Sequence, residues 1–190
     1  MAITVNRTYL ITVPRGRCRE AGSFLAQLDD QSRRMLEDLR GITAAELQWQ
    51  PRAGTNTIGM LLAHIAVVEV YWLMIANETM THDAARKVLR FGVDDDGMPL
   101  PPEKRPPAGL KGKQLAFYRM LLARARAYAK RTARRWPDAT LDRVATRRRR
   151  DGGTSRQNVR WILYHVLEHE AGHYGQILLL RHLYRDRKKA

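Results

Sequence analysis

Three histidines near the end of the sequence have a spacing that suits a metal site. His165, His169 and His173 follow one another at intervals of four in the stretch HVLEHEAGHYGQ. On a helix, side chains four residues apart share a face, with Cβ atoms about 6 Å apart. His169 and His173 can therefore bind one metal ion through their imidazole nitrogens. A straight helix does not bring all three rings to one ion, so a further ligand is expected from another element.

A histidine in a second apolar segment is the natural partner. His64 lies in TIGMLLAHIAVVEVYWLMIANE (57–78), on a helical stripe that is expected to face the core. One core histidine alone is more often satisfied by an ordinary hydrogen bond. A second helix that is expected to face the core carries the pair His169 and His173. One bound metal would explain why histidines occur on both of these apolar helices. We therefore predict a divalent metal bound by His64, His169 and His173, with His165 packing, hydrogen-bonding or supporting a ligand.

The same stretch contains the hydrolase-like patterns HxxEH and HExxH. A metalloprotease of this type needs a third protein ligand, usually a downstream Glu or His. The positions three and six after His173 hold Gln176 and Leu179, and no Glu follows Glu170. The protease interpretation is therefore not favoured, although Glu168 or Glu170 could still orient an imidazole or move a proton.

Long helices are expected to position these side chains. The apolar periodicity predicts helices over 23–41, 57–78, 111–136 and from a cap at Thr154 or Ser155 to about Tyr184. This pattern indicates an all-α fold, a four-helix bundle. Residues 79–110 form a long proline-rich connection between the second and third helices, with a short helix over 82–90. We expect one domain spanning 1–190.

Three smaller features complete this organisation. Residues 1–19 lack a helical period and are predicted to form an extended arm. Residues 43–56 are expected to be a connection with one helical turn, and Thr55, Asn56 or Thr57 to cap the next helix. The segment TLDRVATRRRRDGGTSRQ is expected to be irregular or to form a short hairpin around its Asp-Gly-Gly turn.

Composition limits the classes of partner. The net charge is +15 and the pI about 10.7, with basic clusters at 124–136 and 147–150. No nucleic-acid recognition motif accompanies them, so specific nucleic-acid binding is not expected. The helix at 57–78 is long enough for a membrane span, but His64 and Glu69 would be costly there, so no membrane is expected. A single cysteine excludes an intrachain disulfide, and a cytoplasmic location is expected.

Two segments resemble one protein family. LQWQPRAGTNTIGMLLAHIAVVEVYWL (47–73) and WILYHVLEHEAGHYGQILLLR (161–181) are similar to the DinB-like (DinB/YfiT) superfamily, and most similar to its DUF664-type branch. The resemblance covers about 20–184, and His-x-x-x-His-x-Gly-Gln is its most specific part. The chain has Gly172-His173-Tyr174-Gly175-Gln176 where His-His-Arg-Gly-Gln is commoner.

The resemblance implies an up-down-down-up four-helix bundle with a metal on three histidines, which by motif are His64, His169 and His173. It also implies frequent homodimers. Characterised relatives include metal-dependent transferases and isomerases that use low-molecular-weight thiols such as bacillithiol or mycothiol. A metal-dependent thiol S-transferase acting on a small molecule is therefore the leading functional hypothesis.

Three imidazoles leave coordination positions open, which is the catalytic pattern. Zn²⁺ or Ni²⁺ suits these ligands best, and Fe²⁺ or Mn²⁺ is also compatible. Arg160 is a candidate for binding the carboxylates of a thiol. Glu168 and Glu170 are candidate proton acceptors or supports, and Gln176 could bond the ligand or make a structural contact. The alternatives are a metal-dependent hydrolase with water as nucleophile, and a non-catalytic metal-binding stress-response module with non-specific nucleic-acid affinity.

Overall fold

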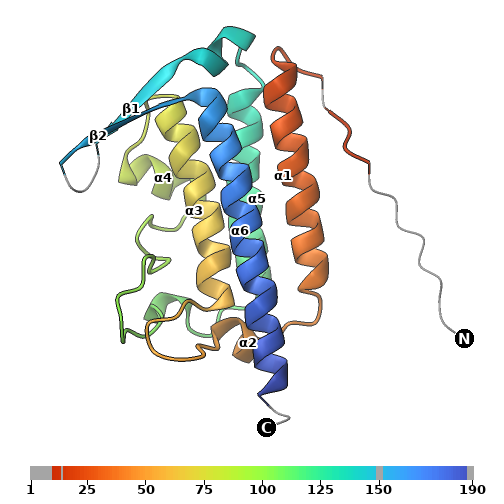
Figure 1. Ribbon diagram of the computed structural model, residues 1–190, viewed down its shortest axis with the longest axis vertical. Coiled ribbons are helices and arrows are strands. Elements are labelled where there is room, and N and C mark those ends of the chain that lie inside the picture. Colours follow the sequence, from red (N-terminus) through yellow and green to blue (C-terminus); the bar gives the residue numbers. More distant parts are fainter. Residues whose placement is uncertain (1–9, 14, 149–151, 188–190) are drawn as a thin grey trace, which may run out of the picture.

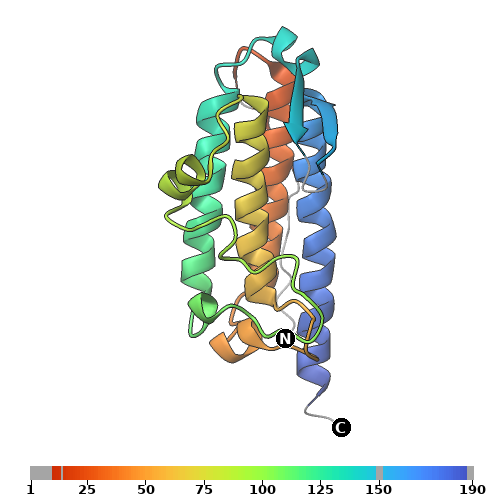
Figure 2. The same cartoon turned by 90° about the vertical axis from the view of Figure 1, so that its left-hand side faces the viewer.

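The computed structural model describes residues 10–13, 15–148 and 152–187. Long helices lie side by side along its main axis (Figures 1 and 2). These are α1 (Arg19–Asp38), α3 (Ile58–Ala76), α5 (Leu115–Ala133) and α6 (Val159–Asp186). The shorter elements are α2 (Ala44–Gln48), α4 (His82–Leu89), two 3₁₀ turns (Ala108–Leu110 and Asp138–Asp142) and the strands β1 (Val144–Arg148) and β2 (Thr154–Asn158). The expected all-α class is therefore seen, with one small hairpin added.

Pairs of contacts show how the long helices run. Tyr118 of α5 packs so closely on Gly59 of α3 that a Cβ there would collide with its ring. Further along both helices, Glu69 bonds to Arg126, so α3 and α5 are parallel. In Figure 1, α1 and α6 run in the opposite direction to α3 and α5.

Helix α3 is the centre of the core. Almost all of its residues are buried, and it packs against both α5 and α6. Among the described residues it is the one helix long and apolar enough to cross a membrane, and 78% of its apolar window is buried inside the protein. Burial on all sides accounts for its uniformly apolar composition.

Side-chain caps fix where the helices begin. Thr57 accepts a hydrogen bond from the backbone N–H of Met60 and so starts α3, as one of the predicted alternatives. The predicted cap of the last helix was wrong. Thr154 and Ser155 lie in β2, paired with the end of β1, and Asn158 caps α6 through the N–H of Trp161.

The hairpin explains this correction. Thr154 and Ser155 pair with Arg148 and Arg147 across an antiparallel ladder, which satisfies their backbone groups before the helix can begin. The polar segment that follows Gly152 and Gly153 is therefore a strand, and α6 starts only where that strand ends.

The connection from α4 to α5 runs down the outside of α3 (Figures 1 and 2). Its Lys104 carbonyl accepts hydrogen bonds from the side chain of Gln50 and the backbone of Gly54, at 2.9 and 3.0 Å. These bonds fix the connection to the segment between α2 and α3. The loop that the prolines predict is thus held against the bundle.

The predicted extended arm lies partly outside the described residues, since 1–9 are not described. Residues 10–13 and 15–18 contain no helix or strand. The Sγ of Cys18 accepts the N–H of Ala21, so α1 begins at Arg19, earlier than the predicted residue 23.

Candidate metal centre

Three histidines from two helices converge beside the core. His64 projects from α3, and His169 and His173 project from α6. One ring nitrogen from each lies within 4.8 Å of the others. The ring centroids of His64 lie 4.9 Å from His169 and 5.2 Å from His173, while the two α6 rings are 4.3 Å apart. The antiparallel packing of α3 on α6 therefore joins the ligands that the sequence separates by about a hundred positions.

The spacing of these nitrogens fits one small cation. Nε2 of His169 and Nε2 of His173 lie 3.0 Å apart. Two nitrogens that are each about 2.1 Å from one ion are separated by at most about 4.2 Å. The ring nitrogens of the other two histidine pairs lie within 4.8 Å of each other. Small rotations of the rings would bring them to the separation that one ion requires. All three histidines are partly buried, so the cluster is reachable from solvent.

Hydrogen bonds on the outer nitrogens orient two of the rings. Nδ1–H of His64 donates to Oδ2 of Asp96 at 2.8 Å, and Asp96 is 1% exposed. Nδ1–H of His173 donates to Oε1 of Gln176 at 2.9 Å. Each bond places the proton on the outer nitrogen and leaves a lone pair on Nε2. A histidine whose far nitrogen donates to a carboxylate or carbonyl is the usual arrangement of a metal ligand.

The surroundings keep the rings of His169 and His173 uncharged. Burial, together with the charges of the neighbouring His173, His64 and His165, lowers the pKa of His169 to about 3. Burial also lowers the pKa of His173. Neutral imidazole is the form that binds metal ions. The protein thus presents nitrogen lone pairs at neutral pH without having to displace protons from these two rings.

His165 does not belong to this group of three. Its ring stacks on Trp161 at 4.7 Å with an interplanar angle of 8°, and its edge meets Trp72 at 5.1 Å. Its Nδ1 bonds to Oε1 of Glu168 at 3.0 Å, and this bond lowers the pKa of Glu168. Packing and hydrogen bonding, one of the alternatives drawn from the sequence, describes His165.

Glu170 faces a different polar centre. Its carboxylate accepts hydrogen bonds from Ser32 at 2.6 Å and from Arg126 at 3.2 Å. Arg126 also bonds to Glu69 at 2.7 Å and to Asp29 at 2.9 Å. Burial raises the pKa of Glu170 to about 7, against the opposing effect of Arg126. The structure therefore does not bring Glu170 into the histidine cluster.

Arg160 also lies away from the histidines. It precedes His169 by nine residues, about 14 Å along the helix axis. Its guanidinium is bonded to Glu20 at 2.8 Å and to Asp142. The guanidinium of Arg160, predicted from the sequence to bind the carboxylates of a thiol, is thus already paired with carboxylates of the protein itself.

Asp96 is the site residue that sequence reasoning missed. It stands in the run Asp94-Asp95-Asp96-Gly97 of the proline-rich connection. Its other oxygen accepts the backbone N–H of Met98 at 3.0 Å, which holds the carboxylate in place. An acidic run near a predicted histidine site is a usable signal, but periodicity does not say which acidic residue turns inward.

Comparison with known families places this geometry in context. A model of the DinB superfamily matches residues 27–177, which include all three clustered histidines and Asp96. Comparison with curated proteins returns no match. Because the matched region covers most of the chain, the chain belongs to the DinB superfamily.

Proposed function

We propose that the protein is a divalent-metal-dependent enzyme that joins a low-molecular-weight thiol, through its sulfur, to a small electrophile. The observation that carries the proposal is the convergence of His64, His169 and His173, whose ring nitrogens lie within 4.8 Å of one another. Three neutral nitrogen ligands from rigid helices leave coordination positions for a substrate, whereas a purely structural site is usually closed by four protein ligands.

A bound divalent cation would supply a Lewis acid that lowers the pKa of a thiol beside it. Zn²⁺ or Ni²⁺ is the proposed ion, with Fe²⁺ or Mn²⁺ compatible with the same nitrogens. Asp96 and Gln176 orient the rings of His64 and His173. These two bonds pre-organise the ligands, so little ordering is needed on binding.

Glu168 is the carboxylate best placed to move a proton. Glu168 is partly exposed and is bonded to His165, which lies one turn before His169. In the proposed reaction the thiol proton passes to this pair or to solvent. The sulfur electron pair then bonds to the electrophilic carbon, whose leaving group departs with its own bonding pair. Glu170 has no part in this step, because Arg126 and Ser32 engage it.

The proposal extends to assembly and location. The helix directions support the up-down-down-up arrangement of DinB/YfiT proteins, and we include in the proposal the DUF664-type branch, a homodimer and a cytoplasmic location. Size-exclusion chromatography with light scattering measures the oligomeric state directly.

Cobalt substitution tests the thiol step. Protein loaded with Co²⁺ should gain a near-ultraviolet sulfur-to-cobalt absorption band when a thiol such as cysteine, glutathione, bacillithiol or mycothiol is added. The S-methylated forms of the same compounds should give no band, and neither should the His64→Ala variant. If the metal-loaded protein binds none of these thiols but hydrolyses ester or amide substrates, the hydrolase alternative replaces the transferase proposal.

A further inference from the structure

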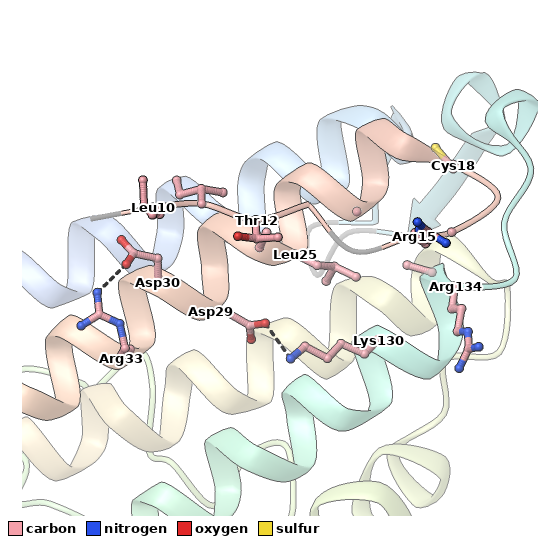
Figure 3. Close-up of a pocket in the computed structure, with 15 residues that line it drawn as sticks. Leu10, Thr12, Arg15, Cys18, Leu25, Asp29, Asp30, Arg33, Lys130 and Arg134 are labelled. Atoms are coloured by element: carbon pink, nitrogen blue, oxygen red, sulfur yellow. Dashed lines mark hydrogen bonds and ion pairs between the residues drawn. The ribbon is translucent and has the colours of Figure 1, made fainter. Parts of the chain in front are cut away.

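A cavity lies on the opposite flank of the bundle from the histidines. It has a volume of about 570 Å³ and opens between residues 10–12, 15 and 16, α1 and α5 (Figure 3). None of the residues that line it belongs to α3 or α6. Its size falls within the range of small-molecule sites, about 300–1,000 Å³. Its apolar wall is formed by Leu10, Ile11, Cys18, Leu25, Ala26 and Ala133.

A second hollow of about 390 Å³ adjoins this cavity. Arginines line it: Arg17 before α1, and Arg131, Arg134 and Arg135 around the end of α5. Arg134 lines both spaces, so the arginines stand at one end of the apolar cavity. Figure 3 shows Arg15 and Arg134 near the end of α5, with the Arg134 side chain directed away from Arg15 and Cys18.

The carboxylates that line the cavity already have cationic partners. Asp29 is 2.6 Å from the ammonium of Lys130, and Arg126 binds its other oxygen. Asp30 is 2.6 Å from Arg33, and this hydrogen bond lowers its pKa. By contrast, none of the arginines around the second hollow forms an ion pair with a described carboxylate. At this end of the cavity the arginines thus outnumber the nearby carboxylates, of which Asp138 interacts with Cys18.

Helix geometry alone does not explain these arginines. Cationic side chains at the end of α5 interact favourably with the helix dipole, which amounts to about half an elementary charge. Four guanidinium groups exceed that charge several-fold, and Arg17 comes from a different segment. Like charges gathered around one hollow repel one another, and an anion bound between them would relieve the repulsion.

We propose that the two adjoining spaces bind an amphiphilic anion, with an apolar chain in the 570 Å³ cavity and a carboxylate or phosphate head between the arginines. Guanidinium forks bind both kinds of head through paired hydrogen bonds. A nucleic-acid backbone would also engage arginines, but it would leave the adjoining apolar cavity empty. This site is separate from the metal centre and does not depend on its proposed chemistry.

Isothermal titration calorimetry on the full chain tests the proposal, with laurate below its micelle-forming concentration as the probe. Dodecyl phosphate, compared with laurate, shows which head group the arginines prefer. Arg134→Glu should weaken laurate binding about tenfold or more, since a charged hydrogen bond is lost and repulsion is added. Arg119→Glu is the matched control, because it is exposed on the same helix but does not line either space, and it should leave binding unchanged.

Further ligands separate the apolar and the charged contributions. Ala26→Trp should fill the cavity and reduce laurate binding, with thermal denaturation verifying that the variant is folded. The proposal is overturned if laurate does not bind, or if Arg134→Glu and Arg119→Glu weaken it equally. Equal binding of dodecyltrimethylammonium or of inorganic phosphate, or displacement of laurate by duplex DNA, would also overturn it.

Discussion

His169 and Glu170 are consecutive on α6, yet they belong to two polar centres of opposite character. His169 meets the rings of His64 and His173, and its Nε2 lies 3.0 Å from Nε2 of His173, which accepts its hydrogen bond. Glu170 meets Arg126 and Ser32, and every polar contact there joins a donor to an acceptor. The first centre brings together three ring nitrogens that could turn to one cation, whereas the donors and acceptors of the second are paired within the protein. The histidine cluster, whose ring nitrogens are not all engaged within the protein, is the site that can take a ligand. The centre around Arg126, whose donors and acceptors are already paired, holds helices together.

Removing the cation of the centre around Arg126 should have the largest effect. Arg126→Met leaves Glu69 and Glu170 buried without compensation, so the free energy of unfolding should fall by about 3–5 kcal/mol in urea denaturation. The matched variant Arg119→Met, on the exposed face of α5, should change it by no more than about 0.5 kcal/mol. Adding Glu69→Gln and Glu170→Gln to Arg126→Met should restore part of the loss. Equal stabilities for the two arginine variants would contradict a stabilising role.

Removing a ligand from the histidine cluster should abolish metal binding. His64→Ala, His169→Ala and His173→Ala should each lower bound metal from about one ion per chain to near zero by elemental analysis. The stabilisation from metal at a hundred times its Kd, about 2.7 kcal/mol, should disappear with it. His165→Ala serves as the control and should retain the ion. If His165→Ala were the only variant to lose the metal, the metal site would have to lie further along the helix, around His165.

Weakening the support of one ligand should have an intermediate effect. Asp96→Asn keeps the shape of the side chain but removes its charge, so metal affinity should fall about 10–100-fold in a competition titration with a chelator. Asp83→Asn, exposed at the start of α4, should leave the affinity unchanged. If both aspartate variants bind metal as tightly as the unaltered protein, the bond to His64 does not tune the site.

Acid should act on the two centres with opposite signs in the metal-free protein. Burial lowers the pKa of His169 from its ordinary value near 6.5 to about 3, so between these pH values the unfolded chain binds more protons and acid destabilises the fold. The pKa of Glu170 is raised from about 4.5 to about 7, so there the folded state binds more protons and acid stabilises it.

The pH slopes of two variants measure this difference. One proton contributes at most about 1.4 kcal/mol per pH unit to the free energy of unfolding. Between about pH 5 and pH 6.5, His169→Asn should reduce the loss of stability with acid, and Glu170→Gln should increase it. Urea titrations with a chelator present give both slopes. Slopes that change in the same direction would contradict the opposite pKa shifts of His169 and Glu170.

Helical spacing was sufficient to predict that His64, His169 and His173 come together, because they lie on regular helices whose faces follow from periodicity. Asp96 escaped prediction because it lies in a connection, where no period relates position to direction. Glu170 was misplaced by its neighbours in sequence: on a helix the next residue points about 100° away, which was enough to carry its side chain to Arg126. The start of α6 was misjudged because the pairing of β2 with β1 is a long-range choice that a local capping signal does not reveal.

The loop that carries Asp96 has an evolutionary consequence. The connection is held by two bonds to the Lys104 carbonyl, by the bond of Asp96 to His64 and by apolar side chains such as Met98 and Leu100 that pack on the core. Its exposed positions take no part in these contacts and can change while the helices stay intact. Selection could thereby retune how strongly the imidazoles grip a cation, and which cation they favour, without altering a single coordinating side chain.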